Sequence, residues 1–166
     1  MIIRNEENSD VEAISEITIA AFENHPVSKQ TEQFIIKALR AAHALAVSLV
    51  AVIEARVVGQ IAFSPVTISG QSGDWYGLGP ISVLPVCQKQ GIGKALMHEG
   101  LSALRNRGAK GCVLVGPPDY YKRFGFRNIP DLILEGVPQE YFLALPFGEN
   151  RANGVVMFHA AFSAKG

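Results

Sequence analysis

The stretch that decides the fold is LPVCQKQGIGKAL, residues 84–96. It places a glycine-rich turn between an apolar run and a long helical pattern. Unpaired backbone N–H groups and the positive end of a helix dipole meet at such a turn, and Gly91 and Gly93 leave the backbone accessible. Lys89 and Lys94 add positive charge. The stretch therefore predicts a site for an anionic group such as a diphosphate.

Two common phosphate motifs do not fit these residues. A dinucleotide-binding turn needs a small residue at its third glycine position, where Leu96 stands. A Walker loop needs glycine in place of Gln88 and serine or threonine in place of Ala95. On glycine spacing alone, an ordinary glycine turn explains the stretch as well as an anion site does.

Hydrophobic periodicity predicts helices and strands on both sides of this turn. Apolar residues recur at helical spacing over residues 9–22, 34–42 and 91–107. Runs of β-branched and aromatic residues predict strands over residues 48–68, with a hairpin turn at 54–56, and over 75–84, 112–115, 142–145 and 155–162. A helical turn is expected at 120–124. No repeat or long linker divides the chain, so one domain is expected over residues 1–166.

Local signals refine these elements. Ser9 and Glu12 are spaced as a capping box for the first helix. The polar segment 69–74 predicts a loop, and Pro65 is expected near a strand end or bulge. The string Gly77–Pro80 should bend its strand.

Composition excludes several classes of protein. The chain is 48% hydrophobic and 18% charged, which is typical of a globular protein and not of disordered or collagen-like chains. Fifteen Lys and Arg balance fifteen Asp and Glu, so no overall field attracts nucleic acid or an anionic membrane. The longest uncharged run, residues 41–53, is shorter than the roughly 20 residues of a membrane helix.

The remaining signals point to an ordinary cytoplasmic protein without a metal. Charged residues interrupt the amino terminus where a secretory segment would begin, so a cytoplasmic location is expected. Cys87 and Cys112 form neither a disulfide framework nor a zinc pattern, and we interpret both as small hydrophobes. His43, His98 and His159 are not spaced as ligands.

Three segments together resemble a known family. Gln88, Gly91 and Gly93 match the Q/R-x-x-G-x-G/A loop of the GNAT superfamily of N-acetyltransferases. The segment YYKRFGF, residues 120–126, resembles the F/Y-Y-x-K/R-x-G-F ending of that family, and ISVLP, residues 81–85, resembles its coenzyme-A-binding strand. The resemblance is to the YhbS-like subgroup and covers almost the whole chain.

This resemblance implies an α/β fold of the α+β type. A mixed, mostly antiparallel central sheet would be flanked by helices, and two central strands would splay apart to admit acetyl-coenzyme A. The Gly77–Pro80 string can distort the first of these strands, and residues 112–115 are the candidate for its neighbour. Backbone groups left without sheet partners near residues 81–83 could then bind the amides of a pantetheine arm.

The resemblance also assigns roles to residues. It implies acetyl-coenzyme A as cosubstrate, bound by the strand residues Ile81, Ser82 and Val83 and by the loop residues Gln88, Lys89, Gln90, Gly91, Ile92, Gly93, Lys94 and Ala95. It places a general-acid tyrosine at Tyr121, whose phenol would donate to the departing thiolate. The backbone N–H of Val83 would stabilise the tetrahedral oxyanion.

The general base is not assigned. Many family members carry a Glu on the strand before the coenzyme loop, where this chain has Ser82. Asp74, Glu54 and His25 could act through water, but a solvent-exposed position explains each of them better. By analogy with the family, the first two helices and the loop near His25 would form one wall of the acceptor pocket, and residues 137–150 another.

The sequence thus predicts direct acetyl transfer to a primary amine of a small molecule or a peptide. Dimers are common in the family, so a homodimer is an open option. A non-catalytic module that binds coenzyme A is the alternative, because the anion loop is clearer than the base. A generic nucleotide-binding protein is a third and weaker reading.

Overall fold

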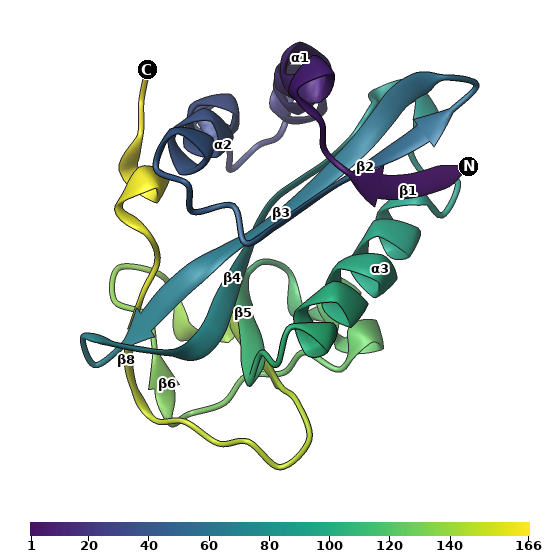
Figure 1. Ribbon diagram of the computed structural model, residues 1–166. Coiled ribbons are helices and arrows are strands. Elements are labelled where there is room, and N and C mark those ends of the chain that lie inside the picture. The colour runs from purple at the N-terminus through teal and green to yellow at the C-terminus, as the bar shows by residue number, and fades with distance from the viewer.

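The computed structural model describes residues 1–166 and alternates helices and strands largely as predicted (Figure 1). The strands are β1 (Ile2–Asn5), β2 (Val47–Ile53), β3 (Arg56–Ile68), β4 (Gln71–Val83), β5 (Gly111–Val115), β6 (Leu132–Ile133), β7 (Phe142–Pro146) and β8 (Gly154–Met157). The α-helices are α1 (Val11–Phe22), α2 (Glu32–Ala41), α3 (Ile92–Asn106) and α4 (Pro118–Tyr121). Short 3-10 helices are η1 (Asn8–Asp10), η2 (Pro85–Cys87), η3 (Lys122–Phe124), η4 (Gln139–Tyr141) and η5 (Ala160–Ser163).

The strands form one mixed sheet in the order β1-β2-β3-β4-β5-β7, and β8 pairs with β3 and β6. Along the main path only the β4–β5 pair is parallel. Helices α1 and α2 lie on one face of the sheet and α3 on the other (Figure 1). The predicted architecture, a mostly antiparallel sheet flanked by helices, is confirmed.

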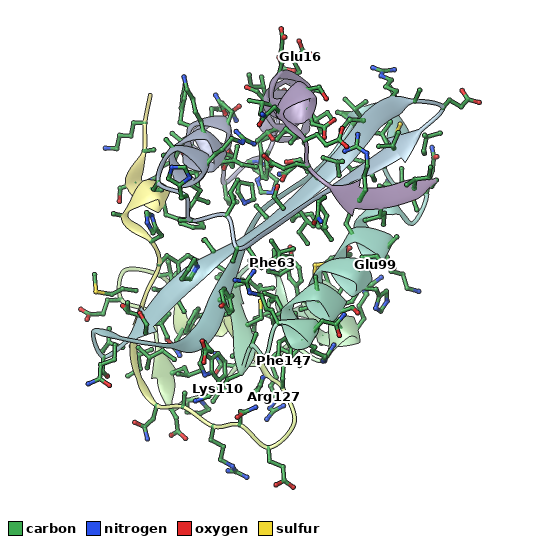
Figure 2. The ribbon with its side chains drawn as sticks, in the orientation of Figure 1. Glu16, Phe63, Glu99, Lys110, Arg127 and Phe147 are labelled. Atoms are coloured by element: carbon green, nitrogen blue, oxygen red, sulfur yellow. The ribbon has the colours of Figure 1, made fainter.

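Alternation along β3 explains why both faces of the sheet are covered. Ile61 and Phe63 are fully buried and pack in one cluster with the apolar side of α3. Ala62, between them, is fully buried in a second cluster with Ile14 of α1 and Ile36 of α2. Figure 2 shows Phe63 between the sheet and α3. Burying an isoleucine or phenylalanine side chain stabilises the fold by about 2 to 3 kcal/mol. Packing on both faces of β3 therefore holds all three helices against the sheet.

The pairing between β4 and β5 is short, and this opens the sheet. It runs only from the Trp75–Gly111 pair to the Gly77–Val113 pair. Beyond Gly77, strand β4 continues to Val83 with β3 as its partner, after a register shift. The edge of β4 that faces β5 is therefore left without a ladder, as the predicted splay requires.

The start of α1 differs from the prediction. The capping box does not use Ser9 and Glu12, because the 3-10 turn η1 precedes the helix. The Glu7 N–H donates instead to the Asp10 carboxylate at 2.7 Å. Arg4 also bonds this carboxylate at 2.7 Å and holds the pKa of Asp10 below its usual range. This ion pair attaches β1 to the first helix, a tertiary contact that local spacing does not reveal.

Two predicted boundaries are also wrong. The polar segment 69–74 is mostly strand, because a turn at Ser69 and Gly70, both with positive φ, lets β4 begin at Gln71. The last strand ends at Met157 rather than continuing to residue 162. There His159 accepts a hydrogen bond from the Ala161 N–H at 3.0 Å and starts η5. No helix in the structure has the length and apolar character needed to cross a membrane.

Candidate active site

A cavity of about 640 Å³ lies at the opening between β4 and β5. Its lining comes from four parts of the chain: Ala21, Phe22 and His25; Ile81, Ser82 and Val83; Cys87, Gln88, Lys89, Gly91, Ile92, Gly93 and Lys94; and Pro117, Tyr120, Tyr121 and Arg123. The tertiary structure therefore brings together the strand, the glycine loop and the YYKRFGF segment. A second cavity of equal volume, near the other end of α3, contains none of these residues.

The glycine loop presents free hydrogen-bond donors. Gly91 caps α3 in the left-handed conformation, with φ of 86°, and no side chain bonds the cap. The Ala95 N–H is the first in the helix to be paired, with the Gly91 carbonyl at 3.0 Å. The four N–H groups of residues 91–94 donate to no protein acceptor. These donors and the helix dipole suit a diphosphate.

Two predicted loop residues do not line the cavity. The Ala95 N–H is already paired with the Gly91 carbonyl, so Ala95 comes directly after the free donors in sequence but adds none. The Gln90 side chain donates to the Val86 carbonyl at 3.4 Å. Gln88 lines the cavity, but its amide donates to the Val83 carbonyl at 3.0 Å. Gln88 thus links the loop to the end of β4.

The backbone of Val83 faces the cavity. The Leu84 N–H donates to Val58 of β3 at 2.9 Å, and successive residues of an antiparallel strand point to opposite sides. The Val83 N–H therefore points away from β3, and so does that of Ile81. Ser82 pairs with Gln60 on β3, so only its side chain reaches the cavity.

The Tyr121 side chain is largely enclosed by neighbouring aromatic rings. Its ring meets Tyr120 edge to face at 4.9 Å between centroids and Phe126 at 6.2 Å. Burial raises the pKa of Tyr121 to about 12, and the neighbouring Tyr120 adds to the shift. Gly116 leaves room for the ring, because a Cβ there would lie 2.5 Å from Tyr121 Cε2. The phenol therefore keeps its proton at neutral pH.

Comparison with known proteins assigns the family. Residues 2–129 match the family model described as "Acetyltransferase (GNAT) domain". The chain belongs to the GNAT acetyltransferase family. It is 35% identical over 127 residues to the N-acetyltransferase YhbS of Escherichia coli, covering 76% of this chain and 73% of that one. The membership predicted from the loop and from YYKRFGF is confirmed.

Two solved structures of the family share the whole fold. A GNAT acetyltransferase of Brucella melitensis in complex with acetyl-CoA is 48% identical, has a TM-score of 0.88, and covers 98% of this chain and 97% of its own. The YhbS structure from E. coli in complex with CoA is 30% identical, has a TM-score of 0.91, and covers 99% and 93%.

Of the three candidate bases, only His25 lines the cavity of this GNAT domain, and Asp74 and Glu54 do not. The His25 ring lies against Phe22 at 5.7 Å. Its Nδ1 accepts the Val27 N–H at 3.4 Å, so the neutral ring carries its proton on Nε2. In that tautomer Nε2 donates a hydrogen bond and does not act as a base. Residues 137–150, predicted as a second wall, contribute nothing to the lining.

Sequence reasoning missed one buried residue of this GNAT site. Gln60 on β3 is fully buried, and its amide donates to the Pro80 carbonyl at 3.2 Å and to Ser82 Oγ at 3.4 Å. It thereby satisfies a carbonyl where the β3–β4 register shifts. A single polar residue within the apolar run VVGQIAF was the signal that could have identified it.

The raised pKa of Tyr121 predicts an unusual titration in this GNAT domain. At pH 10.5 a phenol with the ordinary pKa near 10 is about three-quarters ionised, whereas one near 12 is only about 3% ionised. The phenolate absorbance of wild type minus that of Tyr121→Phe should therefore stay near zero at pH 10.5. A difference midpoint near pH 10 would contradict the burial of this hydroxyl.

The same shift has a consequence for stability. Because the folded pKa lies above the unfolded value, burial of the neutral phenol stabilises the fold fully below about pH 10. This contribution is lost as the pH rises toward 12. The wild type should therefore lose more stability than Tyr121→Phe over this range in alkaline unfolding.

Gly116 supplies a test of the position of the Tyr121 ring. Gly116→Ala would place a methyl group 2.5 Å from Cε2 and 3.1 Å from Cδ2, so the ring must move. We expect kcat to fall about 10- to 100-fold, with coenzyme affinity nearly unchanged. If the effect acts through Tyr121, the double variant with Tyr121→Phe should be no slower than Tyr121→Phe alone. Additive losses would contradict this.

Proposed function

We propose that this chain transfers an acetyl group from acetyl-CoA directly to a primary amine of a small molecule or a peptide. One arrangement supports the proposal: a single cavity is lined by residues 91–94, whose N–H groups are free, and also by Val83 and Tyr121. The acetyl-CoA and CoA complexes of the two related structures support the same cosubstrate here.

The coenzyme would bind along backbone groups. The N–H groups of residues 91–94 would hold the diphosphate, and Lys89 and Lys94 would add charge at the cavity wall. Hydrogen bonds to a charged group contribute about 1.5 to 3 kcal/mol each. The unpaired edge of β4 at Ile81 and Val83 would receive the pantetheine amides, as a neighbouring strand would. Ser82 lies between these two residues and also lines the cavity.

The reacting end would use one donor for each developing charge. The Val83 N–H would stabilise the oxyanion, a role typically worth about 2.7 to 4 kcal/mol. Tyr121 would donate to the sulfur as the thiolate leaves. Full proton transfer from a phenol with a pKa of about 12 to a thiolate whose thiol has a pKa near 8.5 is uphill by about 5 kcal/mol. Tyr121 therefore acts mainly by hydrogen bonding, and less as the proton source.

The proposal is tested by incubating the purified protein with acetyl-CoA and a panel of amines, including peptides, and by measuring released thiol. We expect turnover with at least one amine, and competition by CoA but not by ATP or NAD. Coenzyme binding with no turnover across the panel would favour the non-catalytic coenzyme module instead.

A further inference from the structure

The charge lining the cavity has one sign. Its charged side chains are Lys89, Lys94 and Arg123, all of them basic. The two lysines belong to the diphosphate loop, and the Arg123 guanidinium lies 4.7 Å from the centre of the Tyr120 ring. With the lysines facing the diphosphate, an ammonium ion that enters finds Arg123 and no carboxylate on the wall to pair with.

The wall opposite the coenzyme loop is mostly apolar. It consists of Ala21 and Phe22 at the end of α1 together with the ring of His25. This surface suits an amine that is attached to an apolar group.

The polar groups behind the cavity are neutral. Ser82 Oγ lies 3.5 Å from Thr18 Oγ1 and 3.4 Å from the amide of Gln60. Thr18 in turn donates to the Ile14 carbonyl at 2.7 Å. The chain of hydrogen bonds ends at a backbone carbonyl, which accepts a hydrogen bond but does not take up a proton. This network can orient an amine through Ser82, but it has no place to store an extra proton.

Proton balance then distinguishes between acceptors. When the nitrogen of an uncharged amine attacks the thioester carbon, the C–N bond forms and the C–S bond breaks. One amine proton stays on the amide and the other reaches the departing thiolate, giving an amide and a thiol. An ammonium ion brings one further proton, which must leave before the attack because its nitrogen has no free electron pair.

We infer, building on the acetyl transfer proposed above, that the acceptor is a weakly basic amine, of which a substantial fraction is uncharged near neutral pH, carried on an apolar group. The α-amino group of a peptide with apolar first residues fits this class. At pH 7 about 10% of such groups are uncharged, against about 0.04% of lysine side chains, a difference of roughly 200-fold. Polyamines and aminoglycosides fall in the disfavoured class.

Two matched peptides test the inference. One is Ala-Phe-Ala amide with a free α-amino group, and the other is acetyl-Lys-Phe-Ala amide with only the side-chain amine free. At pH 7 we expect kcat/KM to be at least about 50-fold higher for the first. Its pH profile should level off at the pKa of that amine, measured by titrating the peptide itself, and should move when a less basic α-amine is used.

Equal or better turnover of the lysine peptide at pH 7, or an inflection at one pH for all acceptors, would overturn the inference while acetyl transfer stands. Turnover of neither peptide nor of any amine in the panel would overturn both proposals. A variant adds an independent measurement: His25→Glu places a carboxylate on the acceptor wall. It should improve the lysine peptide about 10-fold relative to the α-amine peptide, and His25→Gln should leave that ratio unchanged.

Discussion

Tyr121→Phe is expected to lower kcat about 100- to 1000-fold while the affinity for CoA stays within about threefold of wild type. The hydroxyl is the only group removed, and the ring contacts with Tyr120 and Phe126 remain. Since the phenol stays protonated below its pKa of about 12, the loss should be nearly independent of pH between 6 and 9. Steady-state kinetics and calorimetric titration with CoA measure the two quantities.

Neighbouring tyrosines supply the comparison. Tyr120→Phe removes the other phenol of the cavity, and Tyr141→Phe removes one that is 42% exposed and does not line the cavity. We expect Tyr141→Phe to behave as wild type. If Tyr120→Phe is slow and Tyr121→Phe is fast, the donor is Tyr120. Full turnover in both would remove a phenol from the mechanism.

Gly91→Ala is expected to weaken binding of CoA about 10- to 100-fold and to lower stability by about 1 to 2 kcal/mol. Gly91 has φ of 86°, a conformation that is costly for any residue with a Cβ. No protein atom lies within 4 Å of a Cβ built there, so the methyl group clashes with nothing in the protein, and the expected loss of affinity comes from crowding of the proposed diphosphate site. Chemical denaturation measures the stability, and calorimetry measures the affinity.

Two other glycines of the same helix separate strain from lost binding. Gly108, just past the other end of α3, has φ of 82° and open space around a built Cβ, so Gly108→Ala should cost similar stability without changing CoA affinity. At Gly93 a Cβ would meet its nearest atom, Tyr120 Oη, at 3.7 Å, an ordinary contact. Gly93→Ala should therefore change stability little, but its methyl group would lie beside Tyr120 and Val83 of the cavity lining and should weaken CoA binding. Equal CoA affinities for Gly91→Ala and Gly108→Ala would contradict the assignment of the loop.

Some features of the site could be read from short segments because their physics is local. A left-handed glycine at the start of a helix exposes N–H groups whatever surrounds it, and the spacing of Gln88, Gly91 and Gly93 identified that turn. The role predicted for Tyr121 and the opening of the sheet came instead from the family resemblance, and the string Gly77–Pro80 only supported the second.

Other features depend on residues that are distant in sequence. Gln60 and Pro80 are 20 residues apart and meet only because β3 and β4 shift register. The Arg4–Asp10 pair replaced the expected capping box, and residues 137–150 packed into β7 and its neighbours instead of the acceptor wall. Periodicity reports which face of an element is buried, but not which element covers it.

The sequence alone indicated the family and the fold class through the resemblance of three segments, and it predicted the glycine turn before α3 because a turn of this kind depends on local backbone conformation. Only the tertiary structure decided which distant segments share the cavity: the end of α1, with Phe22 and His25, lines it together with Val83 and Tyr121, whereas α2 does not. That arrangement follows from packing α1 and α3 on opposite faces of one sheet. The sign of the charge around the reacting atoms is therefore a property of the assembled fold.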